Sequence, residues 1–128
     1  MEREQDIEPR LSDTDAHDRA MSLPIRRVVE QLVDILDLTT VAVIGGVTET
    51  RAVQQWTAGR EPQRPHVLRF ALQIAMMIGS GPEVAQAWFH GNNPRLGDRS
   101  PMLVLRNKPL PEAQSAVLAA ARAFADRG

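Results

Sequence analysis

The stretch VLRFALQIAMMIG, residues 67–79, decides the fold class of this chain. It would be apolar on nearly every side of a helix, with Arg69 and Gln73 as the exceptions. A helix that is apolar all round is buried at the centre of a domain, and this one is shorter than the roughly 20 residues that span a bilayer. We therefore expect the other elements to pack around residues 67–79.

The segments on either side also have helical patterns. Apolar residues recur at spacings of three and four from Pro24 to Asp37, the period of an amphipathic helix. TTVAVIGG, residues 39–46, is short and ends in a glycine pair, which favours a short helix, although its β-branched residues would also suit a strand. Further helices are expected over residues 48–59, 82–89, 101–107 and 111–126. The sequence thus predicts an all-α protein of about seven short helices.

Length and composition are those of a single domain. The chain has 128 residues, of which 43% are apolar, and this is enough to bury a core. It has no cysteine, which excludes disulfides and thiolate metal sites and favours a cytoplasmic protein. The first ten residues, MEREQDIEPR, lack the apolar core of a signal peptide. We expect a soluble, cytoplasmic protein without membrane association.

Charge is distributed unevenly along the chain. The formal net charge is −1, but residues 1–20 carry seven acidic and three basic side chains, and the remainder is therefore net positive. These twenty residues contain few large apolar side chains, so the sequence predicts a disordered acidic tail over residues 1–20. The positive remainder is compatible with nucleic-acid binding without requiring it.

Residues 39–58 have the outline of a helix-turn-helix within a predicted DNA-binding part, residues 22–79. In the second helix Val53 and Trp56 share an inward face, which leaves arginine and glutamine side chains outward. Arginine pairs with guanine edges and glutamine with adenine, and basic residues that follow the helix can contact phosphates. The candidate DNA-binding residues are Arg51, Gln54, Gln55, Arg60 and Arg64. A tight helix pair with a solvated outer face is the alternative interpretation.

The stretch AWFHGNNPRLGDRSPMLVL, residues 87–105, gathers His90, Asn92, Asn93 and Asp98, which could suggest catalysis. A general base needs an orienting partner, whereas asparagine, proline, glycine and serine are the residues that turns and helix caps require. The three histidines lie in separate segments, and no metal-binding or nucleotide-binding motif is present. We therefore expect a rigid corner between two helices, with no enzymatic activity, catalytic residue, metal or cofactor.

AWFHGNNPRLGDRSPMLVLRN followed by AVLAAARAFADRG resembles the toxin-binding domain of the Xre/MbcA/ParS family of bacterial antitoxins. Those proteins carry a short tryptophan-containing helix, an NP-x-L-G-x-x-S/T-P corner, an apolar run and a final alanine-rich helix. The matching positions are Trp88, Asn93, Pro94, Leu96, Gly97, Ser100, Pro101 and Leu105. WTAG, residues 56–59, is similar to the end of the recognition-like helix of the family. The resemblance covers residues 25–128.

The resemblance implies a type II antitoxin whose residues 80–128 block a RES-domain toxin, an NAD-consuming enzyme, by covering the entrance to its active site. It also implies that operator DNA is bound, so that the complex represses its own operon, and that the antitoxin is a homodimer within a larger toxin–antitoxin complex. The expected toxin-binding residues are Asn93, Arg95, Leu96, Gly97, Asp98, Arg99, Arg122 and Arg127. The alternatives are a stand-alone helix-turn-helix regulator, with a C-terminal dimerisation domain, and an adaptor for another partner.

Overall fold

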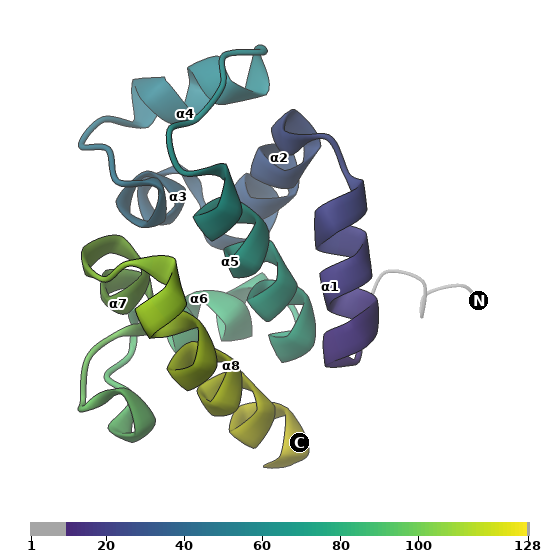
Figure 1. Cartoon of the computed structure of the whole chain (residues 1–128), viewed down its shortest axis with the longest axis vertical. Helices are drawn as coiled ribbons and strands as arrows, with labels where there is room; N and C mark the ends of the chain where they lie inside the picture. The colour runs from purple at the N-terminus through teal and green to yellow at the C-terminus, as the bar shows by residue number, and fades with distance from the viewer. Residues whose placement is uncertain (1–9, 128) are drawn as a thin grey trace.

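Helix α5 (Pro65–Ile78) lies at the centre of the molecule, as the sequence predicts (Figure 1). The computed structural model describes residues 10–127. Within them, α5 is contacted by α1 (Asp13–Ser22), α2 (Ile25–Leu36), α3 (Leu38–Gly45), α6 (Pro82–His90) and α8 (Leu110–Arg127). Ten of the fourteen residues of α5 are buried. The helix begins at Pro65, a residue whose fixed φ suits the first helical position, and ends before Gly79, which has a φ of 58°.

The predicted all-α class is confirmed. Residues 10–127 contain eight α-helices and no strand, and the only additional regular element among them is a single 3-10 turn. In chain order the elements are α1 (Asp13–Ser22), α2 (Ile25–Leu36), α3 (Leu38–Gly45), α4 (Thr50–Thr57), α5, α6 (Pro82–His90), the 3-10 turn η2 (Pro94–Leu96), α7 (Pro101–Asn107) and α8 (Leu110–Arg127). TTVAVIGG therefore lies in a helix, and the strand alternative is wrong.

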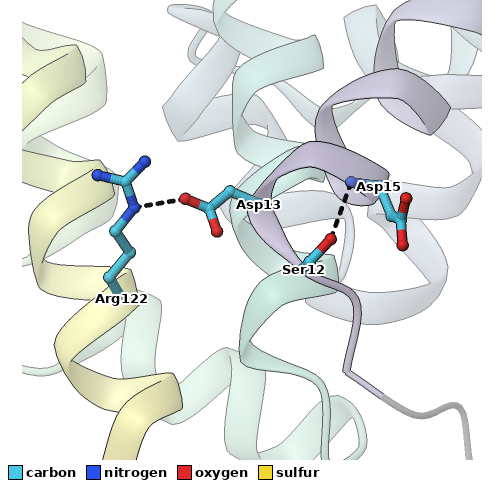
Figure 2. Close-up of polar contacts among 4 residues, drawn as sticks. All are labelled: Ser12, Asp13, Asp15 and Arg122. Atoms are coloured by element: carbon cyan, nitrogen blue, oxygen red, sulfur yellow. Dashed lines mark hydrogen bonds and ion pairs between the residues drawn. The ribbon is translucent and has the colours of Figure 1, made fainter.

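Helix α1 corrects the prediction of a disordered tail over residues 1–20. Residues 1–9 lie outside the described part, but residues 13–20 are helical and pack against α5. Ala16 and Ala20, one helical turn apart, are 0% and 1% exposed. The Ser12 hydroxyl caps the helix by accepting a hydrogen bond from the backbone N–H of Asp15 (Figure 2). Acidic residues in the first turn of a helix interact favourably with the helix dipole. The acidic charges from which the sequence analysis predicted disorder are therefore compatible with this helix.

Two polar residues of α5, Arg69 and Gln73, attach α1 to the centre of the fold. Arg69 donates from Nη1 to the backbone carbonyls of Ala20 at 2.8 Å and Leu23 at 2.6 Å. Gln73 is buried, and its Oε1 lies 3.2 Å from Nδ1 of His17. The Arg69 contacts satisfy carbonyls at the end of α1, where helical carbonyls have no partner within the helix.

A pair of arginines joins α3 to α7; we call them the arginine clamp (Arg64 and Arg106). The Arg64 guanidinium donates to the backbone carbonyls of Ile44, Leu105 and Arg106, at distances of 3.1, 2.9 and 3.3 Å. In the other direction, Arg106 donates to the carbonyls of Val43 and Val47, at 3.0 and 3.1 Å. The carbonyls at the ends of both helices thus receive donors from side chains outside their own helix.

A single hydrophobic core runs through both halves of the chain. It includes Leu32 and Ile44 from the first half and Phe89, Leu105 and Val117 from the second. The predicted parts 22–79 and 80–128 therefore share one core. None of the helices within residues 10–127 combines the length and the apolar character that crossing a membrane requires.

Candidate functional site

The corner between α6 and α7 is closed by hydrogen bonds that converge on Asn93. The Asn93 side-chain oxygen accepts from the N–H of Arg95 at 3.0 Å, and its backbone carbonyl accepts from the N–H groups of Leu96 and Asp98, both at 2.9 Å. Its own N–H donates to the carbonyl of Arg99 at 3.1 Å, the only β-bridge within residues 10–127. The seven residues 93–99 are thereby fixed as a rigid turn.

The residues after Asn93 set the shape of the corner. Leu96 is 7% exposed and attaches the turn to the core. Gly97 and Asp98 follow with φ values of 66° and 63°, in the left-handed region that glycine and aspartate adopt most readily. Buried Ser100 then caps α7 by accepting from the N–H of Leu103 at 3.3 Å, as the sequence predicts.

The predicted toxin-binding residues of the corner fall into two groups. Asn93, Leu96 and Gly97 build the turn, through the hydrogen bonds, burial and backbone conformation described above. Arg95, Asp98 and Arg99 are exposed, and only these three offer charged side chains to a partner. The corner is therefore a scaffold that presents two guanidinium groups and a carboxylate.

A groove lies between this corner and the first turns of α8. Its volume is about 270 Å³, and it is lined by Arg95, Leu96, Arg99, Val104, Lys108, Glu112, Ala113 and Ala116. The sequence prediction missed the last five of these residues. Glu112, Ala113 and Ala116 lie at helical spacings of three and four in α8, but nothing in their own pattern indicates that the corner packs beside them.

Arg122 and Arg127 lie toward the opposite end of α8 from the groove. Ten residues separate Glu112 from Arg122, a rise of about 15 Å along a helix. Arg122 donates to the carboxylate of Asp13 in α1 (Figure 2). Because this guanidinium stabilises the charged carboxylate, the pKa of Asp13 is lowered from its ordinary value of 3.8. Arg127 is exposed in the last turn of α8.

Of the candidate DNA-binding residues, Arg51 and Gln54 are fully available on α4. Both are exposed, and Val53 and Trp56 are buried on the other face of the same helix. Gln55 is half-buried and accepts a hydrogen bond from Arg60 at 2.9 Å. Helix α4 also packs closely against α3. A Cβ on Gly45 of α3 would lie only 2.6 Å from the Trp56 ring of α4.

Arg64 differs from the other candidates, because its guanidinium donates to three backbone carbonyls in the arginine clamp. A guanidinium engaged in this way has few donors left for a phosphate. We therefore assign Arg64 to the fold and leave it out of the proposed DNA surface.

His90, the exposed last residue of α6, makes a side-chain hydrogen bond to α3. Its Nε2 lies 2.8 Å from the hydroxyl of Thr40, a fully buried residue. Within residues 10–127 no three histidine, cysteine or acidic side chains gather in a way that could hold a metal ion. Comparison with family models, with curated proteins and with solved structures finds no match to this chain.

Proposed function

We propose that this chain is a bacterial type II antitoxin that binds a RES-type, NAD-degrading toxin and blocks it sterically. The proposal rests on the resemblance of residues 25–128 to Xre/MbcA/ParS antitoxins and on the character of the corner. The single observation that carries it is the Asn93-centred turn, which presents Arg95, Asp98 and Arg99 outward on a rigid support. The proposal requires no catalytic residue, cofactor or metal of the chain itself.

The proposed mechanism is coverage of the toxin's active-site entrance. In the toxin's active-site entrance, an exposed arginine can take the place of a positively charged group that contacts the ligand. An exposed carboxylate such as Asp98 can pair with the basic residues of the toxin that would otherwise bind NAD phosphates. A rigid corner loses little conformational entropy on binding, which favours a tight complex. Arg122 is assigned a smaller part in this contact than the corner, because it already pairs with Asp13.

Co-expression with the product of the neighbouring gene tests this proposal. Cells that express that product alone are expected to stop growing, and the chain is expected to restore growth and to co-purify with it. Asp98→Ala and Arg127→Ala are expected to weaken protection without unfolding the chain, since both residues are exposed. Arg26→Ala, an exposed change on α2, is the matched control. Growth protection that is unaffected by both test variants would reject the assignment of these residues.

We propose, second, that the antitoxin binds operator DNA through α4 and represses its own operon. The observation that favours this is the exposed pair Arg51 and Gln54 on a helix whose other face is buried. Binding to a fragment of its own promoter is expected to weaken with salt, and Arg51→Ala is expected to weaken it further. The absence of salt-sensitive binding to any promoter fragment would exclude this role. Promoter binding without any captured toxin would instead favour the stand-alone regulator.

The remaining parts of the proposal concern assembly and location. Helix-turn-helix proteins read paired half-sites as dimers, so we propose a cytoplasmic homodimer that joins a larger complex with the toxin. Light scattering after size-exclusion chromatography, with and without the co-expressed partner, measures both states. A monomer at all concentrations would contradict the dimer.

A further inference from the structure

The groove between η2, α7 and α8 has an apolar floor. Leu96, Val104 and Ala113 are buried there, and Ala116 adds an exposed methyl group at the edge. At about 270 Å³ the groove is large enough for one or two apolar side chains and too small for a helix. Burial of an aliphatic or aromatic side chain on such a floor is favourable, and it selects a ligand with an apolar group at its centre.

The rim of the groove is predominantly basic. Arg95, Arg99 and Lys108 surround it, opposed by the single acidic residue Glu112. Within residues 10–127, no acidic side chain lies within salt-bridge distance of these three cations. Guanidinium groups bind carboxylates in a bidentate geometry, and in a partly apolar groove such contacts are stronger than in water.

We propose that this groove docks an acidic protein segment, in which an aliphatic or aromatic side chain enters the floor and flanking carboxylates pair with Arg95, Arg99 and Lys108. A nucleic acid fits less well, because its phosphates gain nothing from an apolar floor. If the proposed function holds, this segment belongs to the toxin, and only that identification of its owner rests on the proposed function.

Titration of the isotope-labelled full chain with synthetic peptides, followed by NMR, tests this inference. The probe is acetyl-EDLFDE-amide, and the two controls are its neutral counterpart acetyl-QNLFNQ-amide and acetyl-EDGGDE-amide, which lacks the apolar centre. We expect the probe to shift the amide signals of residues 95–99 and 112–116. We expect both controls, and single-stranded oligothymidine, to bind about tenfold more weakly or not at all.

Two variants locate the binding. Arg99→Glu reverses one charge of the rim, and Ala116→Trp fills the groove without a change of charge; both residues are exposed, so the fold should persist. Each is expected to weaken probe binding about tenfold or more. Arg26→Glu on α2 is the charge-matched control and should leave binding unchanged.

The possible results separate this inference from the proposed function. No shift with the probe, equal binding of a control peptide or of oligothymidine, or unchanged binding by Arg99→Glu and Ala116→Trp would each overturn the groove assignment. Selective probe binding supports it, even if the product of the neighbouring gene is not captured. In that case the antitoxin proposal fails while the groove assignment stands. Capture of that product that is unaffected by both groove variants would leave the antitoxin proposal intact and place its interface elsewhere.

Discussion

Gly45 of α3 lies directly against the ring of Trp56 in α4. A Cβ at this position would lie 2.6 Å from Cη2 and 2.9 Å from Cζ3 of Trp56, a buried and rigid ring. We expect Gly45→Ala to destabilise the protein, because overpacking costs about 1–3 kcal/mol, more than the roughly 1 kcal/mol that alanine adds to helix propensity. Chemical denaturation measures the change.

The matched experiment places Gly45→Ala in a Trp56→Phe background. The shorter ring withdraws the atoms that the new methyl group would meet, so alanine should cost less there than in the wild type. An equal cost in both backgrounds would show that the approach of α3 to α4 is not limited by this contact.

The ion pair between Asp13 and Arg122 gives the protein a pH-dependent contribution to stability. Because Arg122 lowers the pKa of folded Asp13, the contribution is complete above the ordinary value of 3.8 and is lost as the pH falls through the lowered pKa. The pair is exposed, and such pairs contribute about 0.2–1 kcal/mol. We therefore expect Arg122→Gln to be slightly less stable than wild type at pH 7, and we expect this difference in stability to disappear as the pH falls through the lowered pKa of Asp13. A difference that persists or grows in acid would contradict this assignment.

At the scale of elements, the arginine clamp stabilises the turn between α3 and α4 through hydrogen bonds to backbone carbonyls. Arg106 reaches from α7 to the carbonyls of Val43 and Val47, on either side of the α3 terminus. Removal of its side chain leaves partly buried carbonyls without this donor, at a cost of about 1–3 kcal/mol. We expect Arg106→Ala to lower the free energy of unfolding and to speed amide hydrogen exchange in residues 46–57.

The control for this prediction is Arg99→Ala, a deletion of an exposed guanidinium in the neighbouring corner. It should leave exchange in residues 46–57 as in the wild type. Equal exchange rates for Arg106→Ala and Arg99→Ala would mean that the clamp does not hold the turn.

Helix α1 packs on α5 and buries Ala16 and Ala20. We expect Ala16→Asp to destabilise the protein by about 2 kcal/mol or more, because it places a carboxylate at a fully buried position. Thr14→Asp, an exposed change in the same helix, should have little effect. If the two variants have the same stability by thermal unfolding, α1 does not pack on α5 in solution.

These elements show what can be read from the sequence. Periodicity was sufficient for α2, a run that is apolar on nearly every side was sufficient for α5, and cap residues were sufficient for α7, because each signal lies within the element itself. Helix α1 carries a cap signal, Ser12 before an acidic first turn, but its buried face consists of only two alanines, and the tertiary contacts of Arg69 and Gln73 attach it to α5. Local propensity cannot indicate contacts that are made by a segment fifty residues away.

The candidate site was predictable to a similar degree. The Asn-Pro and Gly-Asp pattern indicated the corner, since turn chemistry is local. The groove was not predictable, because it forms only where α8 passes beside η2. The structural role of Arg64 was missed for the same reason, since its acceptors lie in α3 and α7.

At the scale of the whole molecule, the two proposed surfaces share one core. The exposed face of α4 and the corner with its groove belong to different elements. The arginine clamp connects α3, which precedes α4, with α7, which follows the corner. The surface that a partner would bind at the corner therefore packs on the same core as the first half of the chain. This arrangement would suit the proposed binding of a toxin and of DNA by a single folded unit.

The most direct test of the central claim is NAD consumption by the purified product of the neighbouring gene. That product is expected to degrade NAD on its own, and titration with the full chain is expected to reduce the rate to that of the enzyme-free control. Arg99→Glu should require a higher concentration than wild type for the same inhibition, whereas Arg26→Glu should not. NAD degradation that continues undiminished at saturating concentrations of the chain, or a neighbouring product that does not degrade NAD, would contradict the antitoxin proposal.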